Sequence, residues 1–235
     1  MSVTGIVAAL TAEARTLGPL RSTPDRTHAL AISTLRDGNL LIISGMGPQA
    51  AARAAAALVA AGADGLLSFG LAGALDPQLP AGAMLLPDAV TDGTGAVHRT
   101  CAVWRERLAA RAGAESGGTL LSLAQPLLTP LAKSAARTRT QAYAVDMESF
   151  AIGSVATQAQ VNFAVARVVV DTAVDSLPAS VLRATDAQGV VNYPRLVSGL
   201  LRSPLELFAL LRLASRYRMA MGTLRKLGRQ GLGAP

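Results

Sequence analysis

Two short apolar runs in the first third of the chain end in glycine-rich segments, and this repeated arrangement limits the possible folds most strongly. The run Asn39–Ser44 is followed by Gly45-Met46-Gly47, and the run Gly65–Phe69 is followed by Gly70-Leu71-Ala72-Gly73. Between them, an alanine-rich stretch from Pro48 to about Ala61 has the composition of a helix, with proline in the first turn, where its missing N–H costs little. A strand, a glycine turn, a helix and a second strand predict a parallel α/β sheet.

Further apolar runs predict the remaining strands of this sheet, at Val3–Leu10, Ala83–Val90, Thr119–Leu123 and Phe163–Val170. Helices are expected at Trp104–Ala112 and Met147–Gln158. Ligands of open α/β sheets bind at the carboxyl ends of the strands. We therefore expect Glu13, the two glycine turns and Asp171 to converge on one rim of the sheet.

The length of 235 residues suits one large α/β domain, or at most two small ones. A single cysteine, Cys101, excludes an intrachain disulfide and a cysteine-based zinc site, and two distant histidines, His28 and His98, make a poor metal set. The N-terminus has no basic segment of the kind that opens a signal peptide, and no run of about 18 apolar residues is present. These features predict a cytoplasmic protein without a bound metal ion.

The net charge of +7 is concentrated at the C-terminal end of the chain. From Arg202 onward there are seven basic residues and one acid, Glu206, so +6 of the charge lies there and +1 in the first 201 residues. The body of the protein therefore has no basic face that could follow a nucleic-acid backbone. We expect no nucleic-acid partner and assign the charge to a tail.

The segment Gly45–Ala50 fits the G-x-G-x-x-A pattern of dinucleotide-binding turns, with Asp64 near the distance expected for a ribose-binding acid. The pattern follows a second or third strand instead of the first, which weakens the interpretation as an oxidoreductase. Two other interpretations are a tight turn between a strand and a helix, and a small anion or nucleoside pocket that uses the backbone N–H groups.

Two acidic segments have a structural interpretation as well as a catalytic one. Asp146 and Glu148 flank Met147 at the start of an expected helix, where the helix dipole favours negative charge. Asp171 ends an apolar strand, and such an acid often caps the turn that follows. Neither segment alone decides between the two interpretations.

Together, these segments resemble the purine nucleoside phosphorylase and nucleosidase superfamily, with methylthioadenosine/adenosylhomocysteine nucleosidases closest in pattern. The resemblance runs from about residue 3 to residue 176, through Gly5–Leu10 with Glu13, Ser44–Gly47, Gly70-x-Ala72-Gly73, Val145–Glu148 and Arg167-x-x-x-Asp171. It implies an enzyme with a single α/β domain over residues 1–200, in which helices flank a central mixed, mostly parallel sheet.

The resemblance also implies a role for each matching residue. Asp171 matches the acid that protonates or hydrogen-bonds N7 of the departing purine, which stabilises the leaving group. Glu13 matches the carboxylate that activates the attacking water. Glu148 matches the acceptor of the ribose hydroxyls, and Met147 matches the residue that packs on the sugar, where electron-rich groups favour an oxocarbenium-like state. Further substrate contacts are expected at Gly47, Ala72, Gly73 and Val170.

Three departures from the nucleosidase pattern make the expected pocket more apolar. Leu71 and Val170 stand where the nucleosidases carry serine, and Ser122–Pro126 lacks their Gly-Asp-x-Phe segment. Phosphate remains a possible co-substrate, with Arg21, Arg36 and Arg53 as candidate cations, although Glu13 beside the nucleophile would repel it and favour water. No other cofactor is implied.

Residues 201–235 form a separate expected element, a basic amphipathic helical extension. At 100° per residue its apolar residues share one face: Leu210, Leu213, Ala214, Tyr217, Ala220, Met221, Leu224 and Leu227. Such a helix either lies on a membrane surface or docks its apolar face on the body or on a second subunit.

This tail resembles the C-terminal extension of the hopanoid-biosynthesis-associated phosphorylases. The resemblance implies release of adenine from adenosylhopane, a lipidic adenine nucleoside, in the cytoplasm or at the inner face of the membrane. The superfamily also implies a homo-oligomer. Two alternatives stay open: a methylthioadenosine/adenosylhomocysteine-type nucleosidase, and a non-catalytic nucleoside-binding protein at the membrane.

Overall fold

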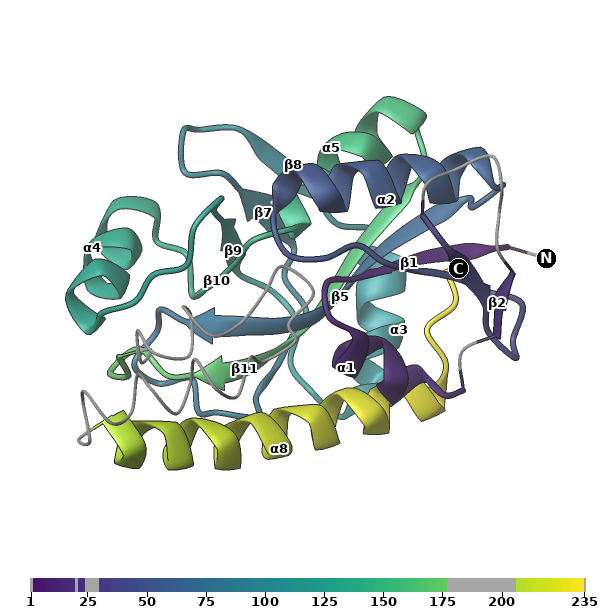
Figure 1. Cartoon of the computed structure of the whole chain (residues 1–235). Coiled ribbons are helices and arrows are strands. Elements are labelled where there is room, and N and C mark those ends of the chain that lie inside the picture. Colours follow the sequence, from purple (N-terminus) through teal and green to yellow (C-terminus); the bar gives the residue numbers. More distant parts are fainter. Residues whose placement is uncertain (1, 20, 24–29, 177–205, 235) are drawn as a thin grey trace.

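The computed structural model describes residues 2–19, 21–23, 30–176 and 206–234, in which eleven strands form one mixed sheet with helices on both faces (Figure 1). The strands are β1 (Thr4–Ala8), β2 (Arg21–Thr23), β3 (Ile32–Thr34), β4 (Leu40–Ile43), β5 (Gly65–Ala74), β6 (Met84–Leu85), β7 (Ala89–Thr91), β8 (Val97–Arg99), β9 (Thr119–Ser122), β10 (Ala144–Asp146) and β11 (Asn162–Asp171). The helices are α1 (Thr11–Ala14), the 3-10 turn η1 (Arg15–Leu17), α2 (Pro48–Ala60), α3 (Ala102–Ala112), α4 (Pro130–Thr140), α5 (Ser149–Ala159) and α8 (Glu206–Gln230).

The sheet is mixed, with long parallel pairings and short antiparallel ones. The main strand order is β2-β3-β4-β1-β5-β10-β9-β7-β8, and β11 pairs with β5 and β6. The longest pairings, β5 with β11, β1 with β5 and β1 with β4, are all parallel. The antiparallel pairings, such as β2 with β3 and β7 with β8, join two or three residues each. The expected α/β fold with a mixed, mostly parallel sheet is therefore confirmed.

Strand β5 is longer than the sequence predicts. The glycine turn expected at Gly70–Gly73 is wrong, because these residues continue the strand and stay in register with β11, where Gly70 pairs with Arg167 and Leu71 pairs with Val168. The end of β5 also pairs with β10, through Gly73 and Val145. One continuous strand thus pairs with β11 along its length and with β10 at its end.

Two other expected elements have different bounds in the structure. The single strand expected at Ala83–Val90 is two strands, β6 and β7, because Pro87 lies between them and has no N–H for a sheet hydrogen bond. The helix expected from Met147 begins at Ser149, with Glu148 as its N-cap residue. Met147 and Glu148 therefore lie in the turn between β10 and α5.

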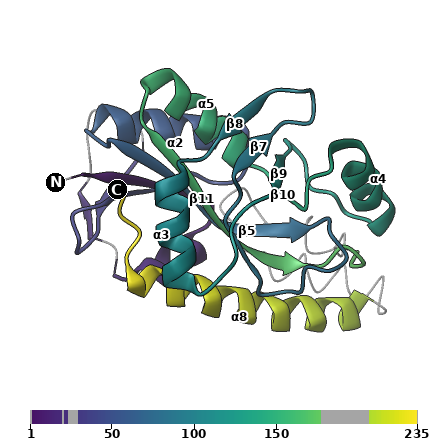
Figure 2. The same ribbon diagram turned by 180° about the vertical axis from the view of Figure 1, so that it is seen from behind.

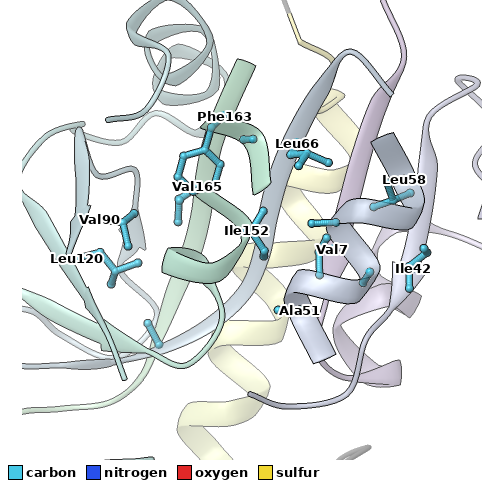
Figure 3. Packing of buried hydrophobic residues seen from close by; sticks show 14 of the residues in the cluster. Val7, Ile42, Ala51, Leu58, Leu66, Val90, Leu120, Ile152, Phe163 and Val165 are labelled. Atoms are coloured by element: carbon cyan, nitrogen blue, oxygen red, sulfur yellow. The ribbon is translucent and has the colours of Figure 1, made fainter. Parts of the chain in front are cut away.

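Each face of the sheet has its own apolar core. Helices α2 and α5 cover one face, where Val7, Leu58, Ile152 and Phe163 pack together (Figure 3). Helices α3 and α8 lie on the other face, where Figure 2 shows them next to each other, and Trp104 is fully buried there. Residues on β1 alternate between the two cores, as the pleat of a strand requires.

The C-terminal half of α8 docks on the body of the protein. Its residues Ala220, Met221, Leu224 and Leu227 are buried against the core that contains Trp104. The chain after the helix is also held, since the Trp104 indole donates a hydrogen bond of 3.0 Å to the carbonyl of residue 232. Over this half, the structure agrees with the interpretation of a docked helix.

The part of the same helix from Leu211 to Met219 is more open. Leu211 and Met219 are 59% and 56% exposed. Within the described residues, no helix is long and apolar enough to span a bilayer. The predicted boundary between residues 200 and 201 lies outside the described residues.

Candidate active site

The carboxyl ends of β1, β5, β10 and β11 meet around one cavity of about 230 Å³. Its lining contains seven of the eight residues predicted from the sequence, all except Gly47. The lining residues are Ala9, Leu10, Glu13, Met46, Leu71, Ala72, Gly73, Pro126, Leu127, Val145, Asp146, Met147, Glu148, Arg167, Val170 and Asp171. The expected convergence of distant segments on one rim is therefore observed.

Glu13 lies on the short helix α1, directly after β1, and is 2% exposed. Its Oε2 accepts a hydrogen bond of 2.9 Å from the backbone N–H of Leu10, and its Oε1 accepts one of 2.9 Å from the N–H of Leu71. Burial raises the pKa of Glu13 to about 7, against the opposing effect of Arg167 and the Leu10 N–H. A carboxyl group with this pKa can accept a proton near neutral pH.

Gly70 allows Glu13 and Arg167 to approach the same point of β5. A Cβ atom on Gly70 would lie 2.5 Å from Glu13 Oε1 and 2.8 Å from Arg167 Nη1, and the φ of +156° also disfavours a side chain. The glycine is therefore required for the close approach of two charged groups, although the sequence suggested a turn.

Glu148 is held at its position between β10 and α5 by two donors. Its Oε1 accepts a hydrogen bond of 2.9 Å from the N–H of Gly47, and its Oε2 accepts one of 3.2 Å from Arg167 Nη2. Burial raises the pKa of Glu148, and Arg167 opposes that rise. Gly47 thus reaches the site through Glu148 and is not part of the cavity lining.

Arg167 is the central cation of the cavity and is 1% exposed. Its Nη2 also donates to Ser68 Oγ at 2.8 Å, and its Nε lies 3.0 Å from Asp146 Oδ2 in an ion pair that lacks hydrogen-bond geometry. Burial acts against this charge, but Asp146, Glu148 and Glu13 together raise the pKa of Arg167 above its usual range. The guanidinium therefore stays charged and partly offsets the negative charge of the neighbouring carboxylates.

Asp171 ends β11 beside Gly73, where a Cβ atom would lie 3.1 Å from Asp171 Oδ2. Lys133 Nζ donates a short hydrogen bond to Oδ2 of this carboxylate. Burial raises the pKa of Asp171, and the Lys133 ammonium opposes the rise. The carboxyl group is therefore both desolvated and paired, which is an environment typical of functional acids.

Arg167 and Lys133 hold the predicted site residues, but the sequence analysis assigns no role to either of them. Arg167 was part of the recognised pattern, and its place in a buried strand after Ala166 already indicates a charge that needs partners. Lys133 lies on α4, which the sequence interpretation left unassigned. The pair Thr129-Pro130 is a sequence signal for the start of that helix, but nothing in the sequence indicates that its lysine is buried.

Two of the three arginines expected as candidate phosphate ligands lie away from this cavity. Arg36 and Arg53 line two other cavities, and Arg53 shares its cavity with the Gly45–Gly47 turn. The side chain of Arg21 lies outside the described residues. Within the part of the chain that the structure describes, no cluster of three or more His, Cys, Asp or Glu side chains could hold a metal ion.

Comparison with models of known protein families shows to which family the chain belongs. The model of the phosphorylase superfamily matches residues 4–202. The chain belongs to the phosphorylase superfamily. This membership confirms the expected class of enzyme, a nucleoside phosphorylase or nucleosidase. A search of curated proteins finds no match.

Solved structures of a nucleosidase and of futalosine hydrolase show the same fold. The 5′-methylthioadenosine/S-adenosylhomocysteine nucleosidase from Neisseria meningitidis, in complex with methylthio-immucillin-A, is 17% identical, with a TM-score of 0.71 over 98% of each chain. Futalosine hydrolase from Helicobacter pylori is 14% identical, with a TM-score of 0.67 over 96% of this chain and 97% of that one. At such identities the likeness concerns the fold alone.

Proposed function

We propose that the protein hydrolyses the N-glycosidic bond of an adenine nucleoside. The observation that carries this proposal is the convergence of Glu13, Glu148 and Asp171 on one cavity, with Arg167 between the acidic groups. Cleavage of this bond needs a base for the nucleophile, a polar contact to the ribose and an acid for the purine. The cavity offers one carboxyl group for each task.

The charges of the cavity favour water over phosphate as the nucleophile. Glu13, Asp146, Glu148 and Asp171 all line it, whereas Arg167 is its one lining cation among the described residues and already pairs with two carboxylates. A phosphate dianion requires free cations, and here it would meet a net negative wall. A neutral water molecule avoids this repulsion.

In the proposed reaction each carboxyl group has one role. Glu13 takes a proton from the attacking water, which its pKa of about 7 permits near neutral pH. Glu148 accepts hydrogen bonds from the ribose hydroxyls, with Met147 against the sugar. Asp171 donates its proton to purine N7 as the bond between C1′ and N9 breaks, so that adenine leaves as a neutral base.

The rest of the lining supports a substrate with an apolar 5′ substituent. Leu10, Met46, Leu71, Leu127 and Val170 surround the polar groups. We therefore propose adenosylhopane as the substrate, with exposed apolar and basic residues of α8 available to a membrane surface. The second candidate is a small thioadenosine, since the apolar lining also suits a methylthio group and the similar structures include methylthioadenosine nucleosidases.

Adenine release tests the proposal directly. The protein is incubated with adenosylhopane and, separately, with 5′-methylthioadenosine, each with and without phosphate, and the sugar product is identified by mass. We expect free adenine and an unphosphorylated sugar in both phosphate conditions, with the faster substrate deciding between the two candidates. A ribose 1-phosphate product would exclude water as the nucleophile, and no release from either compound would support a non-catalytic binding protein.

A further inference from the structure

Helix α4 buries a lysine and exposes a leucine, which is the reverse of the usual arrangement. Lys133 is 1% exposed and Ala136 is 5% exposed, whereas Leu131 is 80% exposed. Burial of an ammonium group is costly unless the charge is paired and hydrogen-bonded. The orientation of α4 therefore indicates a task for Lys133 other than packing.

The ammonium of Lys133 uses all three of its N–H donors on one short segment. It donates to Oδ2 of Asp171, to the carbonyl of Thr172 at 2.7 Å and to the carbonyl of Asp175 at 3.1 Å. A lysine ammonium has three donors and no acceptor, so this hydrogen-bonding capacity is complete. The position of the charge relative to Asp171 is thus defined by three contacts.

The segment that receives these hydrogen bonds is itself held in place. The Asp175 carboxylate accepts hydrogen bonds from the Thr172 N–H at 2.7 Å and the Thr172 hydroxyl at 2.6 Å, and it pairs with Arg216 of α8. Residues from α4, β11 and α8 therefore meet at the end of β11. This arrangement restricts both the lysine and the carboxyl group of Asp171, as a preorganised site requires.

We propose that Lys133 is a positioning residue for the acid that releases the purine. Its ammonium holds Oδ2 of Asp171, presents the other carboxyl oxygen to the base, and stabilises the carboxylate that forms in the reaction. This inference rests on the proposed function. The O–H bond of Asp171 breaks, an N7–H bond forms, and the C1′–N9 electron pair moves into the purine. The water oxygen bonds to C1′ and its proton goes to Glu13.

The charged groups around Asp171 support a role in acid strength. Burial raises the pKa of Asp171, Lys133 lowers it and Asp175 raises it. Arg216 on α8 also interacts with Asp171. Without the Lys133 charge, less would oppose the effect of burial, and the pKa of Asp171 would rise further. Asp171 would then keep its proton to higher pH and become a weaker acid.

The test compares Lys133→Met with the wild-type protein in adenine release from 5′-methylthioadenosine between pH 5 and pH 10. We expect kcat to fall roughly 10- to 100-fold, less than on removal of the acid itself, with a smaller change in KM. The alkaline limb of the pH profile should move upward, because Asp171 must be protonated to act. Lys133→Arg, which keeps the cation, should recover part of kcat and return the limb toward the wild-type position.

Lys226→Met is the matched control, since this second lysine is exposed on α8 and should leave the profile unchanged. An unmoved alkaline limb in Lys133→Met would overturn the inference, even with a lower kcat, because a structural anchor alone predicts that result. A wild-type protein that releases no adenine would overturn the proposed function and the inference with it.

A second variant covers the case in which Lys133→Met does not fold. Lys133→Ala is assayed with propylammonium and with 1-propanol, a neutral molecule of similar size. Recovery with propylammonium alone is the expected result. Equal effects of the two additives would contradict an electrostatic role for Lys133.

Discussion

The two ends of the cavity hold a buried carboxyl group in different ways. Glu13 receives two backbone N–H groups, from Leu10 and Leu71, and lies near the shared cation Arg167. Asp171 receives one side-chain ammonium, from Lys133, which serves no other carboxylate among the described residues. Burial raises the pKa of both groups, so burial alone does not separate their roles.

The difference lies in what each environment can do during a proton transfer. Backbone donors hold both oxygens of Glu13 in place, which suits a group that stays still and accepts a proton. A dedicated cation beside Asp171 favours the ionised form, which suits a group that gives its proton away. Under the proposed function, the neighbours of each group therefore favour Glu13 as the base and Asp171 as the acid. The following experiments test this difference.

The largest expected effect follows removal of the acid. Asp171→Asn keeps the size of the side chain but has no proton of suitable acidity for the purine, so kcat for adenine release should fall by about 10²- to 10⁴-fold. Circular dichroism should show an intact fold. Asp92→Asn, in the loop between β7 and β8, is the control and should leave kcat unchanged. Undiminished turnover in Asp171→Asn would show that Asp171 is not the acid that protonates the purine.

Loss of the shared cation should have the largest effect on stability. Arg167→Met leaves Asp146, Glu148 and Glu13 buried without their neutralising charge, so the free energy of unfolding should fall by about 3–5 kcal/mol, measured by urea denaturation. Arg137→Met is the matched control. Arg137 pairs with Asp76 at the surface, and its loss should cost about 1 kcal/mol or less. Equal costs for the two variants would contradict the central role of Arg167.

A single methyl group at Gly70 should disturb Glu13 but not Asp171. A Cβ in Gly70→Ala would meet Glu13 Oε1 and Arg167 Nη1, so we expect a loss of about 1–3 kcal/mol in the free energy of unfolding and a lower kcat. Gly222→Ala on α8 meets no atom within 4 Å and should instead stabilise that helix by up to about 1 kcal/mol. A neutral Gly70→Ala variant would show that the two charged groups do not need this approach.

The last expected effect concerns pH and is the acidic limb of the pH profile. Glu13 must be ionised to accept a proton from water, and its pKa is about 7. As the pH falls below that value, kcat/KM should therefore decrease about tenfold per pH unit. Glu13→Gln should remove this limb together with most of the activity. A limb near the ordinary glutamate pKa would show that another group is the base.

Most of the central sheet could be predicted from the sequence, because its strands are continuous apolar runs. The run Phe163–Val170 differs from β11 by one residue at each end. The strand β10 was not predicted, since three residues are too few to show a period. The sequence analysis identifies this segment only through the Val145–Glu148 motif. A motif of chemically active residues thus indicates the segment, whereas the hydrophobic pattern does not.

The charged groups that contact the site carboxylates could not be predicted from the sequence. The contact of Lys133 with Asp171 joins residues 38 positions apart, and its helix has an ordinary polar composition. The role of Gly70 depends on two side chains that arrive from α1 and β11. Such contacts depend on the folded structure, and no local pattern in the sequence predicts them.

Strand β5 sets the separation between the carboxyl groups of Glu13 and Asp171. The N–H of residue 71 holds Glu13, and the backbone of residue 73 lies against Asp171. Two residues of a strand span roughly 6.5 Å, so the peptide backbone acts as a ruler between the proposed site of nucleophile activation and the proposed site of base release. Because a ruler made of backbone does not depend on side chains, Leu71 and Ala72 are free to shape the pocket for the substrate while the separation of the two carboxyl groups stays the same.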